Sequence, residues 1–132
     1  MNLKKFIAVS MILCSVFSMC AAYSEENTPR ADLYFSSAYA YIYSNKNLRI
    51  TCITYDIHNS IKIKACWLEQ LIDGEWETAA RITVPNNETT NATSIGVQFS
   101  CAQYIGSGTF RVGFTANADG HLITRYSNER TY

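Results

Sequence analysis

The sequence has 132 residues, 48% of them hydrophobic, and a formal net charge of zero at pH 7. This length allows one domain. Without residues 1–22, which we expect to be removed, the chain keeps 9 basic and 11 acidic residues, a net charge of about −2. That balance argues against a nucleic-acid partner, because such proteins carry a basic face.

Residues 1–22 are predicted to be a helical secretory signal peptide. Lys4 and Lys5 form its positive start, residues 6–17 are its apolar run, and residues 20–22 offer small side chains for cleavage. Two alternatives stay open. One is an uncleaved membrane anchor, for which the apolar run is short. The other is a lipoprotein modified at Cys20, although Met19 stands where a small residue is expected.

Residues 23–33 are polar and are predicted to be a flexible leader, so the domain is expected to span residues 34–132. The first strand is predicted over residues 34–43. It is followed by a turn at 45–47 and a strand over 48–57. In that second strand the apolar residues change sides after Cys52, which either a β-bulge near Cys52 or burial of both faces would explain. Residues 58–60 are expected to turn the chain.

The next strand is predicted over residues 61–68. Its alternation places Trp67 on the apolar face and Cys66 on the opposite one. A hairpin turn at 72–75 leads to a return strand over residues 76–84, and residues 85–93 are predicted to be a polar loop. The strand after that loop carries its apolar side chains on one face: Ile95, Val97, Phe99 and Cys101.

The clearest local pattern is a hairpin over residues 104–126. Apolar side chains at 110, 112, 114 and 116 alternate with polar ones, and Asp119-Gly120 suits the positive φ angles of a tight turn. The chain thus shows about seven strands with frequent turn signals, and no helix after the signal peptide. This profile predicts the all-β class, as a single antiparallel immunoglobulin-like β-sandwich.

Two resemblances bear on this prediction. Cys52 lies 15 residues before Trp67, which resembles the cysteine–tryptophan spacing of immunoglobulin-like and fibronectin type III-like domains. The segment 106–112 resembles the lead into their sixth strand. Phe110 stands where that family has a corner tyrosine, and Val112 where it has the second cysteine. The usual disulfide between the sheets is therefore not expected.

The second resemblance covers more of the chain. The signal peptide, an Ala-Tyr-Ile-Tyr strand, Trp76 after a glycine turn and the glycine–aromatic pattern from Tyr104 to Gly120 are similar to uncharacterised small secreted proteins of Gram-positive bacteria. This resemblance implies a secreted protein with a sandwich fold. It carries no catalytic residue over to this chain.

No set of residues in the sequence predicts catalysis. Both histidines fall at predicted turns, and nucleophilic hydrolysis needs a nucleophile, a base and an orienting acid together. Glu75 and Glu77 share one strand face about 7 Å apart, which would suit a glycosidase pair. The simpler interpretation is a solvated strand edge that resists aggregation.

Three cysteines follow residue 22, so at most one internal disulfide can form. We expect three reduced thiols, and Cys52–Cys101 is the first candidate pair if a bond forms, because both are predicted on apolar faces. No metal site and no cofactor are expected, since the sequence has no C-x-x-C pair after residue 22 and its histidines lack partners at ligand spacing.

Tyr39, Tyr41 and Tyr43 alternate along the first predicted strand and form a stripe on one face. An exposed stripe of this kind can stack on sugars or anchor a protein partner, whereas a buried one is ordinary packing. We therefore expect a secreted, extracellular, non-enzymatic binding module whose ligand is a glycan, a protein or a second copy of the chain. The alternatives are a small secreted hydrolase that uses Glu75 and Glu77, and a purely structural surface component.

Overall fold

A computed structural model describes residues 32–132. The predicted signal peptide and most of the predicted leader lie outside these described residues. Leu33–Tyr132 form one compact unit of seven strands, with no helix in the described part of the chain. The strands are β1 Phe35–Ile42, β2 Asn47–Ile72, β3 Glu75–Arg81, β4 Glu88–Ser100, β5 Thr109–Ala118, β6 His121–Tyr126 and β7 Arg130–Thr131.

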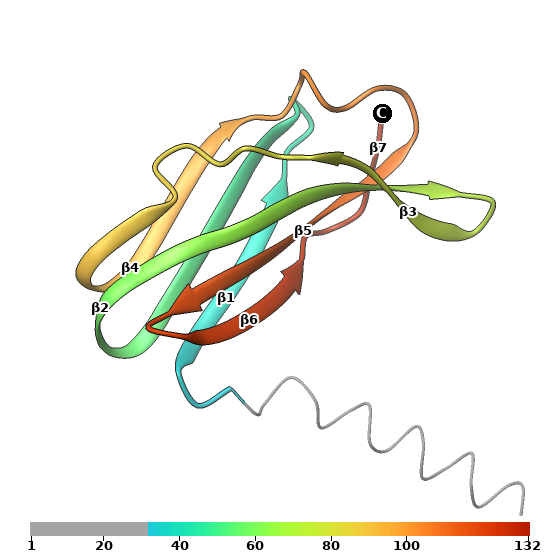
Figure 1. Ribbon diagram of the computed structural model, residues 1–132. Coiled ribbons are helices and arrows are strands. Elements are labelled where there is room, and N and C mark those ends of the chain that lie inside the picture. Colours follow the sequence, from blue (N-terminus) through green and yellow to red (C-terminus); the bar gives the residue numbers. More distant parts are fainter. Residues whose placement is uncertain (1–31) are drawn as a thin grey trace, which may run out of the picture. The chain divides into compact units, whose positions relative to one another are not determined.

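The 26-residue strand β2 organises the sheet (Figure 1). Its first part lies between β1 and β4, and its second part pairs with β5 on one side and with β4 and then β3 on the other. Strands β6 and β7 both pair with β5. Every pairing is antiparallel, and the seven strands form one hydrogen-bonded sheet that curls like a half-barrel. The all-β class and the antiparallel strands are confirmed.

The turn predicted at residues 58–60 is wrong. The chain passes through these residues as part of β2, although the register with β4 shifts between Ile53 and His58. The reason is a partner far away in sequence. The amide groups of Asn59 and Ser60 donate to the carboxylate of Asp119, at 2.8 and 3.0 Å. Residues that favour a turn therefore stay in a bent strand, because their backbone groups are satisfied there.

The predicted positions of Trp67 and Cys66 are also wrong. Ile63 pairs with Ala116 and Ala65 pairs with Thr115, so Lys64 is an extra residue of a β-bulge. Past the bulge the alternation is reversed. Cys66 and Leu68 enter the core, and Trp67 stands on the outer face. Because of the bulge, the alternation of apolar residues in the sequence continues, but the side chains after the bulge face the opposite side of the sheet.

No bulge interrupts β2 at Cys52, which stays in register with both Ala38 and Ile95. Nor are both faces covered. Thr54 continues the inward row of Leu48, Ile50 and Cys52, whereas the apolar residues 53, 55 and 57 are exposed on the outside. The change of apolar parity in the sequence therefore marks an apolar patch that faces solvent.

Two segments with polar sequences form strands. The loop expected at 85–93 is shorter, because β4 begins at Glu88 and pairs with the bend of β2. The C-terminal residues Arg130 and Thr131 form β7 against the start of β5. Both segments gain strand structure from backbone pairing, which polar side chains do not prevent.

The core fills the concave side of the curled sheet. The hairpin prediction is confirmed: Phe110, Val112, Phe114 and Ala116 are all buried, and Asp119 and Gly120 turn with φ angles of 48° and 94°. The largest fully buried side chains come from β1, β2 and β5 together: Phe114, Ile42, Leu48, Ile50, Ile61, Ile63, Leu68 and Val112.

Candidate functional site

The candidate site is an exposed apolar surface over β1 and the first part of β2. Three tyrosines lie beside Arg49 of β2: two belong to β1, and the third follows it directly. A row of exposed apolar residues continues along β2. We call this surface the tyrosine face and define it as Tyr39, Tyr41, Tyr43, Arg49, Ile53, Tyr55 and Ile57. It contains all three tyrosines that the sequence predicted as binding residues.

The pairing register explains why these side chains share one surface. Tyr39 pairs with Thr51, and Tyr41 pairs with Arg49. The alternate residues Ala40 and Ile42 point into the core and are 6% and 0% exposed. Because side chains on a strand alternate between faces, burial of one set turns the tyrosines outward.

The tyrosine stripe is partly held in place by its neighbours. The rings of Tyr41 and Tyr43 meet edge to face with their centroids 4.8 Å apart. Arg130 donates from Nη2 to the Tyr41 hydroxyl at 3.1 Å, and the Tyr132 hydroxyl donates to the carbonyl of Tyr43. The ring contact and the hydrogen bond to the Tyr41 hydroxyl restrict the rings of Tyr41 and Tyr43 before any ligand arrives, which lowers the entropic cost of binding. The bond from Tyr132 holds the backbone at Tyr43.

A shallow cavity of about 360 Å³ lies among Tyr39, Tyr41, Tyr43 and Arg49. Arg49 is exposed, and its guanidinium has no ion pair or hydrogen bond within the described residues. The cavity therefore combines three aromatic rings with one uncompensated positive charge. Tyr and Arg are the residue types that most often anchor protein interfaces.

The strand partners of Tyr39 have two unusual features. Gly96 is the neighbour of Thr51 on β4, and a Cβ added to it would meet nothing within 4 Å, so the surface is open there. The hydroxyl oxygen of Thr51 is buried and has no hydrogen-bond partner in residues 32–132. A buried hydroxyl usually has a partner, so this oxygen is an unsatisfied polar group on the residue that pairs with Tyr39.

The row along β2 extends the face beyond the stripe. Ile53, Tyr55 and Ile57 are 38%, 63% and 71% exposed. Together with Tyr39 and Tyr41, which are 43% and 40% exposed, they give five large apolar side chains on neighbouring strands. Single exposed apolar residues are common, but a contiguous group marks an interaction surface.

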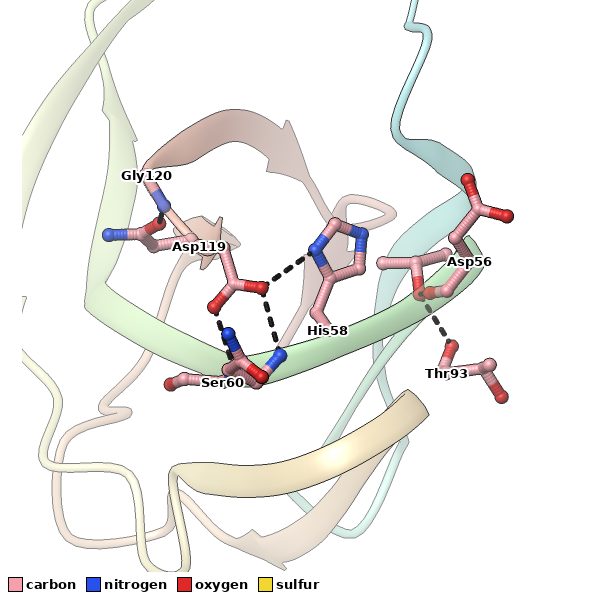
Figure 2. A network of polar contacts seen from close by, with 9 residues as sticks. Asp56, His58, Ser60, Thr93, Asp119 and Gly120 are labelled. Carbon is pink, nitrogen blue, oxygen red and sulfur yellow. Dashed lines mark hydrogen bonds and ion pairs between the residues drawn. The ribbon is translucent and has the colours of Figure 1, made fainter.

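His58 and Asp119 form the clearest pair of titratable groups (Figure 2). Asp119 reaches from the β5–β6 turn, and its Oδ2 lies 3.2 Å from His58 Nδ1. The hydrogen bond from the Asn59 amide is the main cause that lowers the pKa of the Asp119 carboxyl, and the Ser60 amide and His58 act in the same direction against desolvation. Within the described residues, no hydroxyl or thiol hydrogen-bonds to the other ring nitrogen of His58. The pair therefore braces the bend of β2 and lacks a nucleophile.

The remaining predicted residues do not join the tyrosine face. Glu75 and Glu77 are exposed on β3 next to its hairpin turn, and neither lines the cavity at the stripe. Cys52, Cys66 and Cys101 are buried free thiols, so the candidate pair Cys52–Cys101 is not bonded in the structure. Burial raises the pKa of Cys52 and Cys66 to about 12 and that of Cys101 to about 11, which makes all three poor nucleophiles.

A polar–aromatic ladder that the sequence did not lead us to expect lies on the outer face of β2, β3, β5 and β6. The guanidinium of Arg111 lies between the rings of Trp76 and Tyr126, 4.4 and 4.2 Å from their centroids. Arg111 Nε donates to Glu69 at 2.7 Å, and Trp67 Nε1 donates to the second oxygen of that carboxylate at 2.9 Å. The missed signal was the pair Glu69 and Arg111, one charge on each strand, which become cross-strand neighbours in the observed register.

Comparison of the chain with protein-family models and with curated proteins finds no match. Among the described residues, no helix is long and apolar enough to span a membrane. The same part of the chain contains no group of three metal-binding side chains.

Proposed function

We propose that this protein is a secreted, non-enzymatic binding module that uses the tyrosine face to hold a protein partner. The observation that carries this proposal is the group of five exposed apolar side chains on β1 and β2. The expected immunoglobulin-like sandwich fits this function, because its rigid strands present side chains in a fixed array.

The chemistry of the face favours a protein over a glycan. Ile53 and Ile57 extend it with aliphatic side chains, which bury apolar surface but do not stack on sugar rings. Arg49 is the one charged residue in the defined face, and it has no partner within residues 32–132. The partner that fits best therefore presents apolar side chains around one carboxylate. This carboxylate would pair with Arg49 while the apolar side chains displace water from the surrounding surface.

The alternatives have less support. A glycan-binding face would rest on the tyrosine stripe alone. A hydrolase would need Glu75 and Glu77 in a cleft, and the structure places both exposed beside a hairpin turn. A purely structural surface component would not need a contiguous apolar surface, since exposed apolar groups carry a risk of aggregation.

The proposal is tested by selection from a random peptide library displayed on phage. The protein is immobilised and selected in parallel with a Tyr39→Ala/Tyr41→Ala variant. We expect peptides enriched on the unmodified protein to combine aromatic or aliphatic residues with one acidic residue, and to be lost on the variant. Peptides retained equally by both proteins would contradict the proposal, and binding to a panel of neutral glycans in their place would favour the stripe as a sugar platform.

Leu122→Ser is the matched control for surface apolarity. Leu122 is 55% exposed on β6 and does not belong to the tyrosine face. We expect this variant to retain the selected peptides fully. Thermal melts of all three proteins show whether a lost signal reflects lost folding.

A further inference from the structure

A second hollow opens on the outer surface of the sheet, between Trp67 and strand β3. Its volume is about 410 Å³, and it shares no residue with the tyrosine face. Its lining combines two basic side chains, an indole and a hydroxyl with small or apolar residues: Lys64, Ala65, Cys66, Trp67, Thr78, Arg81 and Ile82.

The hollow exists because Trp67 lies over β5, on the other side of β2 from β3. A Cβ added to Gly113, the β5 partner of Trp67, would lie 2.4 Å from the indole ring. Only glycine at this position lets the ring lie so close to the β5 backbone. Arg81, the β3 partner of Trp67, is thereby left uncovered. The bulge at Lys64 adds a second exposed basic side chain to the same cavity.

The aromatic wall of the hollow is fixed in advance. Trp67 Nε1 donates to Glu69 at 2.9 Å, and Glu69 is held by Arg111 at 2.7 Å. Arg111 is itself packed between two aromatic rings. A wall held by three successive contacts loses little freedom when a ligand binds.

The charges of the hollow are not compensated. Neither Lys64 nor Arg81 has an ion pair or side-chain hydrogen bond in the part of the chain that the structure describes. Glu69, which binds the Trp67 indole at the edge of the hollow, also binds Arg111 with its other carboxylate oxygen. Two like charges beside a concave surface raise the local concentration of anions.

We propose that this hollow binds a sugar ring that carries a carboxylate, as in a uronic acid. Lys64 and Arg81 would bind the carboxylate, the planar guanidinium suiting its two oxygens. Trp67 would contact the apolar face of the ring, and the Thr78 hydroxyl would hydrogen-bond to a ring hydroxyl. The aromatic wall is the feature that favours a sugar over an acidic amino-acid side chain.

The test is a titration of isotope-labelled protein followed by NMR, with the Trp67 indole N–H as reporter. Glucuronate is compared with glucose, which lacks only the carboxylate, and with acetylated glutamate amide, which lacks only the sugar ring among the proposed contacts. We expect glucuronate to shift the reporter with a dissociation constant in the millimolar range, as suits a ligand of this size. Glucose and the glutamate derivative should bind at least about tenfold more weakly.

Two variants assign the binding to the hollow. Arg81→Gln and Lys64→Gln should each weaken glucuronate binding roughly five- to tenfold. Lys62→Gln removes an exposed charge two residues from Lys64 and outside the cavity, and should change binding less than about twofold. The proposal is overturned if glucuronate does not bind, if glucose or the glutamate derivative binds equally well, or if Lys62→Gln weakens binding as much as Arg81→Gln does.

Discussion

Trp67 lies against the backbone of Gly113, so closely that no side chain fits between them. The two residues are cross-strand neighbours of β2 and β5, and the indole also meets the ring of Tyr126 edge to face at 6.1 Å. This contact joins the central strand to the closing hairpin on the outer side of the sheet. It also leaves the hollow beside β3 open.

Gly113→Ala should destabilise the protein by about 1–3 kcal/mol, because the new methyl group overlaps the indole and forces it to move. The free energy of unfolding from urea titration measures this change, and the near-ultraviolet circular dichroism of tryptophan should change with it. Gly96→Ala is the control, because its methyl group would enter open space. Equal stability of Gly113→Ala and the unmodified protein would show that Trp67 does not lie on this glycine.

Phe114→Ala should cost about 3–5 kcal/mol of unfolding free energy, because Phe114 is fully buried at the centre of the core. That is a large part of the total stability expected for a domain of this size. Thermal and urea unfolding both measure it. Leu122→Ala, on the exposed side of the same hairpin, should stay within about 0.5 kcal/mol of the original protein, and a similar loss in both variants would contradict the observed burial.

The closing hairpin shows what local sequence can predict. Its apolar residues alternate without interruption, and Asp119-Gly120 specifies the turn through positive φ angles. Both the alternation and the turn residues lie within the hairpin itself, so no distant residue is needed to predict it. The tyrosine stripe was predictable for the same reason, since alternation along β1 separates the tyrosines from Ala40 and Ile42.

The errors arose where distant residues decide the local structure. Residues 58–60 have the composition of a turn, and they stay in a strand because they pair with β4 and because Asp119, 59 to 61 positions later, binds them. The bulge at Lys64 has no sequence signal. Ala65 and Trp67 continue the apolar alternation of Ile61 and Ile63, although the bulge has already turned their side chains to the other face of the sheet. The hollow beside β3 depends on this bulge, so periodicity could not indicate it.

Asp119 should make stability depend on acid pH. Its folded-state pKa lies below its ordinary value of 3.8. The carboxylate therefore stabilises the fold above about pH 4, and this contribution is lost as pH falls through the lowered folded-state pKa. Asp119→Asn should lower the melting temperature at neutral pH and flatten the loss of stability between about pH 4 and pH 2. A parallel acid profile for the variant would show that other carboxyl groups cause the loss, and His58→Gln separates the contribution of the ring from that of the amides.

The three core thiols should be inert in the folded protein. With pKa values of about 11 to 12, almost no thiolate is present at pH 8, and burial blocks access. We expect iodoacetamide to leave Cys52, Cys66 and Cys101 unmodified in buffer and to alkylate all three in concentrated urea, as read by mass spectrometry. Alkylation of the folded protein would contradict their burial, and a bonded Cys52–Cys101 pair would contradict the free thiols.

The central claim is that the tyrosine face is a binding surface, and the most direct measurement is the dissociation constant of a peptide selected on the unmodified protein. We predict that Tyr39→Ala/Tyr41→Ala weakens this peptide at least about tenfold, since two central aromatic anchors are removed, and that Leu122→Ser leaves the constant unchanged. An equal dissociation constant for the tyrosine variant and the unmodified protein, with both proteins folded, would contradict the claim.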